Sequence, residues 1–399
     1  SSVLCFGFAL AEDYEQLALM RFLLGFVGAG FVIGIRMIGE WFPAKQTGIA
    51  QGIYGGWGNF GSAGGALILP SLALWYGGDD GWRWAIASTG VLTAIYSVVY
   101  FFSVTDTPKG STYFKPKKSG ALEVTSVGDL ILYLLMNIPL YAALAVLTWK
   151  LGPDNLGMLG SSVSYLIYAV LLGLYLFQTA RILQINLSLF SEEVPELERY
   201  SFRQVAALNL SYMVTFGSEL AIVSMLILFY QDTFALSPVM AGLIASIFAG
   251  LNIIMRPAGG WISDNFGRKR SLGMIMLGLV LGFLMMSQID SSWSLPSAIL
   301  VTIFCSLFVN AGNGAVFAMI PLVKRRLTGQ IAGMTGAYGN VGAVTFLTVL
   351  SFVETELFFL LIATTAVVTL VVILLFLEEP KGSMAEVLPD GTVELIKVD

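Results

Sequence analysis

The sequence predicts an all-α membrane protein that crosses the bilayer several times, and two features of the chain support this prediction. Apolar residues make up 56% of the 399 residues and charged residues only 12%, which is too little charge for the surface of a soluble domain of this length. Apolar runs long enough to cross a bilayer as helices also follow one another along the chain, and strand-like alternation is nowhere sustained.

The composition also excludes several kinds of site. The chain contains no histidine, so imidazole ligands, imidazole bases and imidazole proton relays are excluded. Its two cysteines, Cys5 and Cys305, lie in separate apolar runs and give no sign of a disulfide framework or a metal site. We expect a monomer that is not an enzyme and has no metal, cofactor or nucleic-acid partner.

The apolar runs give the predicted helices in order. Residues 3–11 are too few to cross a bilayer, and we expect them to end a helix that begins outside this chain. The full helices are expected at residues 17–42, 47–75, 82–104, 130–149, 163–183, 205–230, 238–263, 271–289, 295–323, 329–353 and 357–377. The segment after Glu378 is polar, and we expect no regular structure in it.

Basic residues in alternate loops predict the orientation of these helices. The basic loops carry Lys45, Lys109, Lys115, Lys117, Lys118, Arg268–Arg270 and Lys324–Arg326, whereas the intervening loops carry no lysine or arginine. The positive-inside rule therefore places the basic loops and the C-terminus in the cytoplasm, with the chain in the cytoplasmic membrane. The expected divisions are an N-terminal part (1–104), a central linker (105–203) with an extra membrane hairpin (130–183), a C-terminal six-helix part (204–378) and a cytoplasmic tail (379–399).

A glycine-rich segment, residues 47–61, has a copy at residues 328–342, with glycines and one asparagine at matching positions. Glycine at these spacings lets another helix or a small ligand approach the backbone, and one such helix in each half is typical of transporters built from repeated halves. The asparagines Asn59 and Asn340 either line the pore or bridge helices. The glycines expected to line the pathway are Gly55, Gly56, Gly58, Gly61, Gly336, Gly339 and Gly342.

A charged motif lies in the loop between two predicted helices. Residues 260–270 resemble the Gly-x-x-x-Asp-Arg-x-Gly-Arg-Arg loop of the major facilitator superfamily, with Asn265 at the usual basic position. The resemblance implies a conformational gate formed by Asp264, Gly267, Arg268 and Lys269; the alternative is an ordinary membrane-flanking charge cluster. It also implies that the glycine helices are the fifth and eleventh of twelve, so that the first, second and most of the third are absent.

Three further segments narrow the resemblance. Residues 55–61 with 336–342, residues 211–219 and residues 255–260 are similar to the nitrate/nitrite porter family within that superfamily. The resemblance implies that Arg256 and Tyr212 bind the anion, together with a second arginine that this chain does not contain. Arg256 lies inside an apolar helix, where a charge is costly unless it is paired or functional, and its planar fork of donors suits a trigonal oxyanion. Pairing with a carboxylate or helix end is the alternative for Arg256, and simple packing is the alternative for Tyr212.

Glu219 lies two turns after Tyr212 on the same helical face. Desolvation would favour its protonation, which makes it a candidate proton-coupling group. The alternative is a salt bridge with Arg256 or Arg36, although Arg36 and Glu40 have the spacing of a helical ion pair. The sequence thus predicts a transporter that imports nitrate, and nitrite, coupled to protons or to nitrite exchange. The rival functions are transport of another small anion and a non-transporting membrane sensor.

Overall fold

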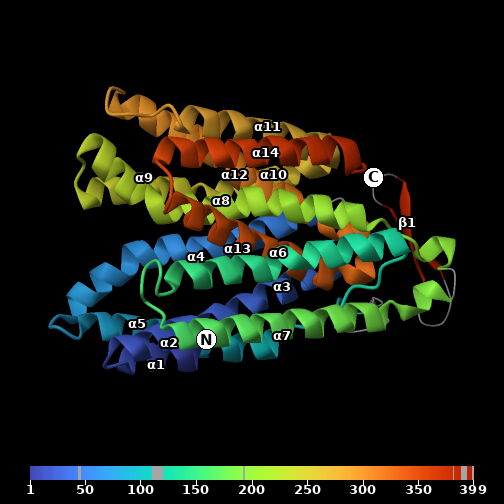
Figure 1. Cartoon of the computed structure of the whole chain (residues 1–399), viewed down its shortest axis with the longest axis horizontal. Helices are drawn as coiled ribbons and strands as arrows, with labels where there is room; N and C mark the ends of the chain where they lie inside the picture. The colour runs from blue at the N-terminus through green and yellow to red at the C-terminus, as the bar shows by residue number, and fades with distance from the viewer. Residues whose placement is uncertain (44–45, 110–119, 192–193, 381, 388–392, 398–399) are drawn as a thin grey trace.

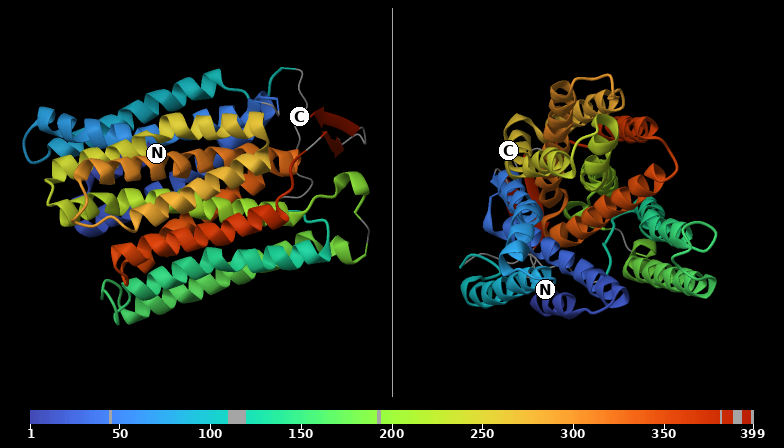
Figure 2. Two further views of the ribbon diagram at one scale, coloured as in Figure 1. Left: turned by 90° about the horizontal axis from the view of Figure 1, so that it is seen from above. Right: turned by 90° about the vertical axis from the view of Figure 1, so that its left-hand side faces the viewer.

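The computed structural model is an elongated bundle whose helices run along one common direction (Figures 1 and 2). The structure describes residues 1–43, 46–109, 120–191, 194–380, 382–387 and 393–397. Within these residues, nine helical segments are long and apolar enough to cross a membrane, as expected of a multi-pass membrane protein. The predicted basic positions Lys45, Lys115, Lys117 and Lys118 lie outside the described residues.

The elements follow the order of the apolar runs. The first part of the chain forms α1 (Ser2–Leu10), α2 (Tyr14–Gly25), the 3-10 turn η1 (Phe26–Ala29), α3 (Gly30–Trp41), α4 (Thr47–Tyr76), α5 (Gly81–Ser103), α6 (Val127–Leu151) and α7 (Ser161–Ile185). After the short turns η3 (Leu187–Phe190) and η4 (Glu196–Glu198) come α8 (Phe202–Phe234), α9 (Pro238–Gly250), α10 (Asn252–Phe266), α11 (Arg268–Met286), α12 (Leu295–Val323), η5 (Arg325–Leu327), α13 (Thr328–Leu350) and α14 (Thr355–Phe376).

Two predicted helices are divided in the structure. The run at 17–42 becomes α2 and α3 with η1 between them, where Gly25, Gly28 and Gly30 fall close together. Glycine is a weak helix former, so a cluster of three favours a local change of winding. The run at 238–263 is divided at Leu251 into α9 and α10, between Gly250 and the helical Pro257, which donates no backbone hydrogen bond.

The polar tail also differs from its prediction. It forms a two-stranded antiparallel hairpin of β1 (Ser383–Val387) and β2 (Val393–Lys397) instead of remaining irregular. The β-branched Val393 and Ile396 of β2 favour a strand, and the polar composition of the tail as a whole concealed this local preference. The hairpin lies beyond the end of the helix bundle at which the basic loops Arg268–Arg270 and Lys324–Arg326 meet, called the basic end below (Figure 1).

Glycines bring the helices around the centre of the bundle into backbone contact. A Cβ atom at Gly52 of α4 would lie less than 3.0 Å from the backbone of α10, and one at Gly217 of α8 would lie equally close to the backbone of α13. On the other side of α10, a Cβ at Gly314 of α12 would meet the carbonyl oxygen of Arg256. Helix α10 is therefore held closely between α4 and α12, which fixes the position of the side chains it carries.

The extra hairpin of α6 and α7 lies at the edge of the bundle (Figure 2). Helix α6 packs against α13 and α8. The hydroxyl of the buried Tyr338 on α13 donates to the Met136 carbonyl oxygen of α6 at 2.5 Å, one turn before Pro139. A proline inside a helix disturbs the hydrogen bonds of the preceding turn, which favours an outside donor at that position.

Candidate functional site

Arg256 lies at the centre of the bundle on α10, directly before Pro257. Its side chain is buried, with 1% of the residue exposed, and Nη2 donates to the Tyr212 hydroxyl of α8 at 3.1 Å. Gly55 of α4 makes room for the guanidinium, because a Cβ there would lie less than 3.0 Å from its Nε, Cζ and Nη2 atoms. Three helices thus place one cation and one hydroxyl together.

Aromatic rings surround the Arg256 guanidinium. Its Cζ atom lies 5.6 to 6.0 Å from the ring centres of Phe31, Tyr212, Phe216 and Phe317. The Tyr212 ring stacks on Phe216 with centres 4.9 Å apart and meets the edge of Phe317 at 4.8 Å. The ring faces favour the cation and exclude water, so the guanidinium keeps donors available for an oxyanion.

Two polar side chains near this position have buried atoms without a hydrogen-bond partner within the described part of the chain. Arg256 Nε is buried without an acceptor, and neither side-chain polar atom of the buried Gln51 has a partner. Gln51 lies one turn before Gly55 on the same side of α4. Unpaired buried donors are costly, and a small anion between these residues would supply the missing acceptors.

Glu219 on α8 lies in a cluster of amides. Its Oε1 accepts from Asn59 of α4 at 3.0 Å and from Asn252 of α10 at 2.7 Å, and its Oε2 accepts from Asn313 of α12 at 2.5 Å. Arg36, one of the two arginines considered as a salt-bridge partner for Glu219, pairs instead with Glu40 at 2.7 Å, which confirms the predicted ion pair. The carboxylate therefore joins four helices through neutral donors.

The cluster can also accommodate a protonated Glu219. The side-chain carbonyl oxygens of Asn252 and Asn313 are buried without a donor in the described structure. A carboxylic acid has one O–H donor, and rotation of the Asn313 amide would present an acceptor to it, whereas the Asn252 amide is also held by Asn310. Both protonation states of Glu219 can thus be hydrogen-bonded without moving a helix.

The two glycine helices do not present their predicted residues in equivalent ways. Gly55 and Gly56 are buried against α10, and Gly339 and Gly342 are buried against α8. A Cβ at Gly58, Gly61 or Gly336 would meet no atom of another described residue within 4 Å, so these three glycines are not needed for close packing there. Asn59 joins the Glu219 cluster, whereas the exposed Asn340 donates back to the Gly336 carbonyl oxygen of its own helix at 3.3 Å.

The charged motif forms a carboxylate-centred contact between α10 and α4. Asp264 pairs with Arg268 at 2.7 Å, and its two oxygens accept from the backbone amides of Gly48 at 3.2 Å and Ile49 at 3.0 Å. These amides belong to the first turn of α4, and the first amides of a helix find no acceptor within the helix itself. The Asp264 carboxylate therefore caps a helix that lies far away in the sequence and stabilises its positive end.

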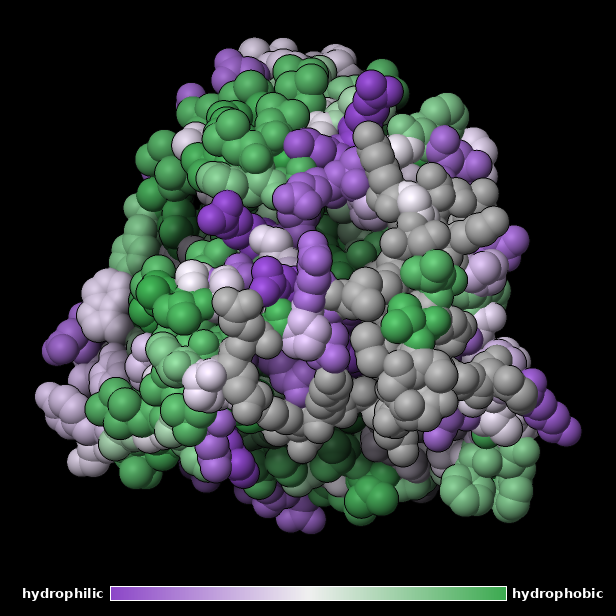
Figure 3. Space-filling view, turned by 90° about the vertical axis from the view of Figure 1, so that its right-hand side faces the viewer, coloured by the Kyte–Doolittle hydropathy of each residue, from purple (hydrophilic) through white to green (hydrophobic). Residues whose placement is uncertain are grey.

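The rest of the motif links α11 to the segment after α14. Gly267 has a φ of +91°, which a residue with a side chain rarely adopts. Glu379 accepts from the backbone amides of Arg268 at 2.5 Å and Lys269 at 2.7 Å, and Lys269 Nζ donates to the Leu374 carbonyl oxygen at 2.9 Å. Figure 3 shows this end of the bundle, where hydrophilic residues gather along the middle of the face.

Sequence reasoning singled out Arg256, Tyr212, Glu219, Asn59 and the charged motif. The structure brings these into three groups along α4 and α10: Arg256 with Tyr212, Glu219 with Asn59, and the charged motif with the first turn of α4. Sequence reasoning missed several side chains around these residues: Gln51, Asn252, Asn313, Phe31, Phe216 and Phe317. The three amides could have been found by the argument used for Asn59, because an amide inside an apolar helix needs a partner. The rings gave no signal among so many other aromatic residues.

Comparison with known proteins identifies relatives along nearly the whole chain. A sequence model described as Major Facilitator Superfamily matches residues 1–195 and 208–396. The chain is 46% identical to the nitrate/nitrite transporter NrtP of Nostoc punctiforme, over 96% of this chain and 78% of that protein. It is 45% identical to the NrtP of a Picosynechococcus species, over 97% of this chain and 80% of that protein. Among solved structures, the proton:xylose symporter XylE matches with a TM-score of 0.57 and 14% identity, over 95% of this chain and 79% of that one, which shows a shared fold alone.

Proposed function

The chain belongs to the Major Facilitator Superfamily, and on this premise we propose that it carries nitrate, and nitrite, across the membrane by alternating access. The substrate proposal is supported by the two relatives named nitrate/nitrite transporter, of which this chain covers 78% and 80%. One observation at the site supports it further: a buried arginine with an unpaired Nε beside a tyrosine hydroxyl, enclosed by rings.

Nitrate would bind between the Arg256 guanidinium and the Tyr212 hydroxyl. A planar anion with three equivalent oxygens can accept two parallel N–H donors from the guanidinium fork and a third donor from the hydroxyl. The rings of Phe31, Phe216 and Phe317 would lower the local dielectric and strengthen these hydrogen bonds. Gln51 would offer its amide from α4 to the remaining oxygen.

The Asp264 contact would act as the gate of the transport cycle. We place the basic end in the cytoplasm, because its loops carry the arginines and lysines. The pairing of Asp264 with Arg268 and with the first turn of α4 then closes the cytoplasmic side. Release of the anion inward would require the first turn of α4 to leave this carboxylate.

The energetics of anion uptake require a coupled step. Moving one negative charge inward costs ~2.3 kcal/mol of free energy for each 100 mV of negative-inside potential. Glu219 is our candidate proton carrier for two reasons. Its amide cluster has an acceptor for a protonated carboxyl, and Glu219 itself lies on the same helix as Tyr212. Exchange for outgoing nitrite would meet the same requirement, with Glu219 then serving to hold the four helices together.

Uptake of labelled nitrate into proteoliposomes tests the proposal. The parent protein should accumulate nitrate when either an inward proton gradient or internal nitrite is supplied. Arg256→Lys keeps the charge but loses the planar fork, and we expect its initial rate to fall at least about tenfold, the equivalent of about 1.4 kcal/mol. Arg203→Lys, at an exposed position of α8, is the matched control and should transport as the parent does.

Two results would contradict the proposal. If Arg256→Lys transported nitrate as fast as the parent, Arg256 would not be the residue that binds the anion. Binding of nitrate without uptake under either driving force would indicate a sensor instead of a transporter.

A further inference from the structure

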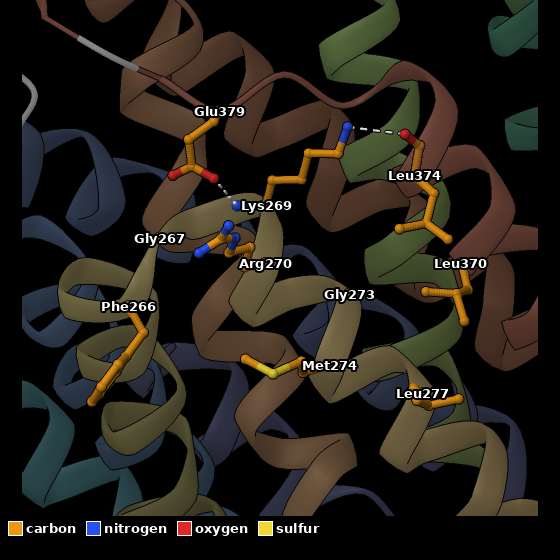
Figure 4. Close-up of a pocket in the computed structure, with 10 residues that line it drawn as sticks. All are labelled: Phe266, Gly267, Lys269, Arg270, Gly273, Met274, Leu277, Leu370, Leu374 and Glu379. Carbon is orange, nitrogen blue, oxygen red and sulfur yellow. Dashed lines mark hydrogen bonds between the residues drawn. The ribbon is translucent and has the colours of Figure 1, made fainter.

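A groove of about 1040 Å³ lies on the outer side of the bundle between α11 and α14, at the basic end (Figure 4). It is separate from the Arg256 site. Its walls come from the first three turns of α11, from Leu370 and Leu374 of α14, and from Phe266 at the end of α10. Gly273 forms part of its floor, and a Cβ there would meet no atom of the other described residues within 4 Å.

The groove has a cationic end. Lys269 and Arg270 lie at its mouth, where α11 begins. Lys269 Nζ is hydrogen-bonded to the Leu374 carbonyl oxygen, and the Glu379 carboxylate is held by two backbone amides of α11. Within the described part of the chain, Arg270 is exposed and has no recorded ion pair or hydrogen bond, so its guanidinium can bind an anion.

The remainder of the groove is apolar and faces outward. Met274, Leu277, Leu374 and Phe266 remain 49% to 59% exposed, so the protein itself does not cover them. Met274 and Leu277 lie on α11 one and two turns beyond Arg270, which places them up to about 10 Å deeper along the helix. In a membrane-spanning chain this is the distance from the headgroup region into the acyl chains of one leaflet.

We propose that this groove binds one anionic phospholipid from the leaflet at the basic end. The lipid phosphate would accept hydrogen bonds from Arg270, whose planar donors match a phosphate oxygen pair. One acyl chain would lie over Gly273 against Met274, Leu277 and Leu374. A zwitterionic lipid would bring its own cation against Lys269 and Arg270, and a free phosphate would leave the apolar walls uncovered. The combination of charge and shape therefore selects a lipid with net negative charge.

Native mass spectrometry of the purified protein tests this assignment. The protein is exchanged into detergent containing equal amounts of phosphatidylglycerol and phosphatidylcholine, and retained lipid is counted. We expect the parent to retain phosphatidylglycerol preferentially. Arg270→Gln should lower that retention roughly fivefold, the equivalent of about 1 kcal/mol per basic residue at a membrane surface. Gly273→Leu should lower it similarly by filling the acyl position.

Each variant has a matched control on the lipid-facing helix α7. Arg181→Gln removes an exposed arginine near the same end of the bundle, and Gly173→Leu enlarges an exposed glycine with open space around it. Both controls should retain phosphatidylglycerol as the parent does. Thermal melting of every variant checks folding. If Gly273→Leu proves unstable, Arg270→Gln still tests the proposal, because it changes an exposed side chain.

Three outcomes would overturn the proposal. The parent could retain the two lipids equally, both groove variants could bind as the parent does, or the controls could lose lipid to the same extent. A further arm adds excess inorganic phosphate. Full displacement of the lipid by phosphate would show a simple anion site without a role for the apolar walls.

Discussion

At the scale of single residues, Tyr212 has two separable roles at the centre of the bundle. Its ring stacks on Phe216 and packs edge-to-face with Phe317, and its hydroxyl accepts from Arg256. Tyr212→Phe keeps the stacking and removes only the hydroxyl. A hydrogen bond to a charged group contributes about 1.5–3 kcal/mol, so we expect the KM for nitrate to rise at least about tenfold. Concentration-dependent uptake measures this, and a fall in maximal rate at unchanged KM would contradict it.

Glu219 offers a second test at this scale. Glu219→Gln can still accept from Asn59, and its amide can donate to the unpaired oxygen of a rotated Asn313, so we expect the protein to fold. An imposed proton gradient should no longer drive nitrate uptake, whereas exchange for internal nitrite should persist. Glu356→Gln, at an exposed position, is the control. Proton-driven uptake that survives in Glu219→Gln would remove this residue from the coupling step.

The residues that sequence reasoning identified are those whose chemistry conflicts with their surroundings. Arg256, Glu219 and Asp264 carry charge at positions that the apolar pattern places inside or at the end of a helix. Their partners depend on which helices become neighbours, and a single sequence does not determine that. Asn59 and Asn340 illustrate the limit, because they occupy equivalent positions of the repeat and yet face different surroundings.

At the scale of helices, the glycines of α4 differ in what a side chain would meet. A Cβ at Gly52 would overlap the α10 backbone, whereas one at Gly58 meets nothing within 4 Å among the described residues. Alanine is favoured over glycine in a helix by about 1 kcal/mol at either position. We expect Gly58→Ala to be neutral or stabilising. Gly52→Ala should destabilise the protein by about 1–3 kcal/mol, because the overpacked helices must separate.

Thermal melting of the purified variants measures this difference, and nitrate uptake should fall in Gly52→Ala alone. Equal behaviour of the two variants would show that close approach of α4 and α10 is unimportant. The comparison controls for helix propensity, because both changes are made on one helix.

Helix existence followed from the sequence because long apolar runs have few other solutions in a membrane. The run at 17–42 was expected as one helix, and the structure inserts the 3-10 turn η1. Hydropathy averages over many residues and is insensitive to a local change of winding. The break at Leu251 was missed for the same reason, although Gly250 and Pro257 on its two sides were visible signals.

At the scale of the whole molecule, the extra hairpin is fastened to the C-terminal helices at its base. Arg326, beside α13, lies 3.2 Å from Glu123 and 3.9 Å from Glu198, two carboxylates on the chain that leads into and out of the hairpin. The Tyr200 hydroxyl donates to the Glu123 carbonyl oxygen at 2.8 Å. Burial and the nearby Asp129 carboxylate raise the pKa of Tyr200, so the phenol stays neutral and remains a donor.

We expect Arg326→Gln to weaken this attachment. Removing the cation leaves two largely buried carboxylates close together, and breaking a buried ion pair costs about 3–5 kcal/mol. The thermal midpoint of the purified protein should fall by several degrees. Arg203→Gln, at an exposed position, should leave it unchanged. A midpoint that is unaffected in Arg326→Gln would mean that the hairpin is held by its helix contacts alone.

The position of Arg326 in the chain has a consequence for how the protein is made. Glu123, both hairpin helices and Glu198 leave the ribosome well before Arg326, which is synthesised only after α12. During membrane insertion the hairpin can therefore pack against α8 but lacks both its contact with α13 and the cation for its two carboxylates until Arg326 and α13 emerge. Shortened nascent chains that end before Arg326 should leave this hairpin accessible to chaperones, and completion of α13 should close that interval.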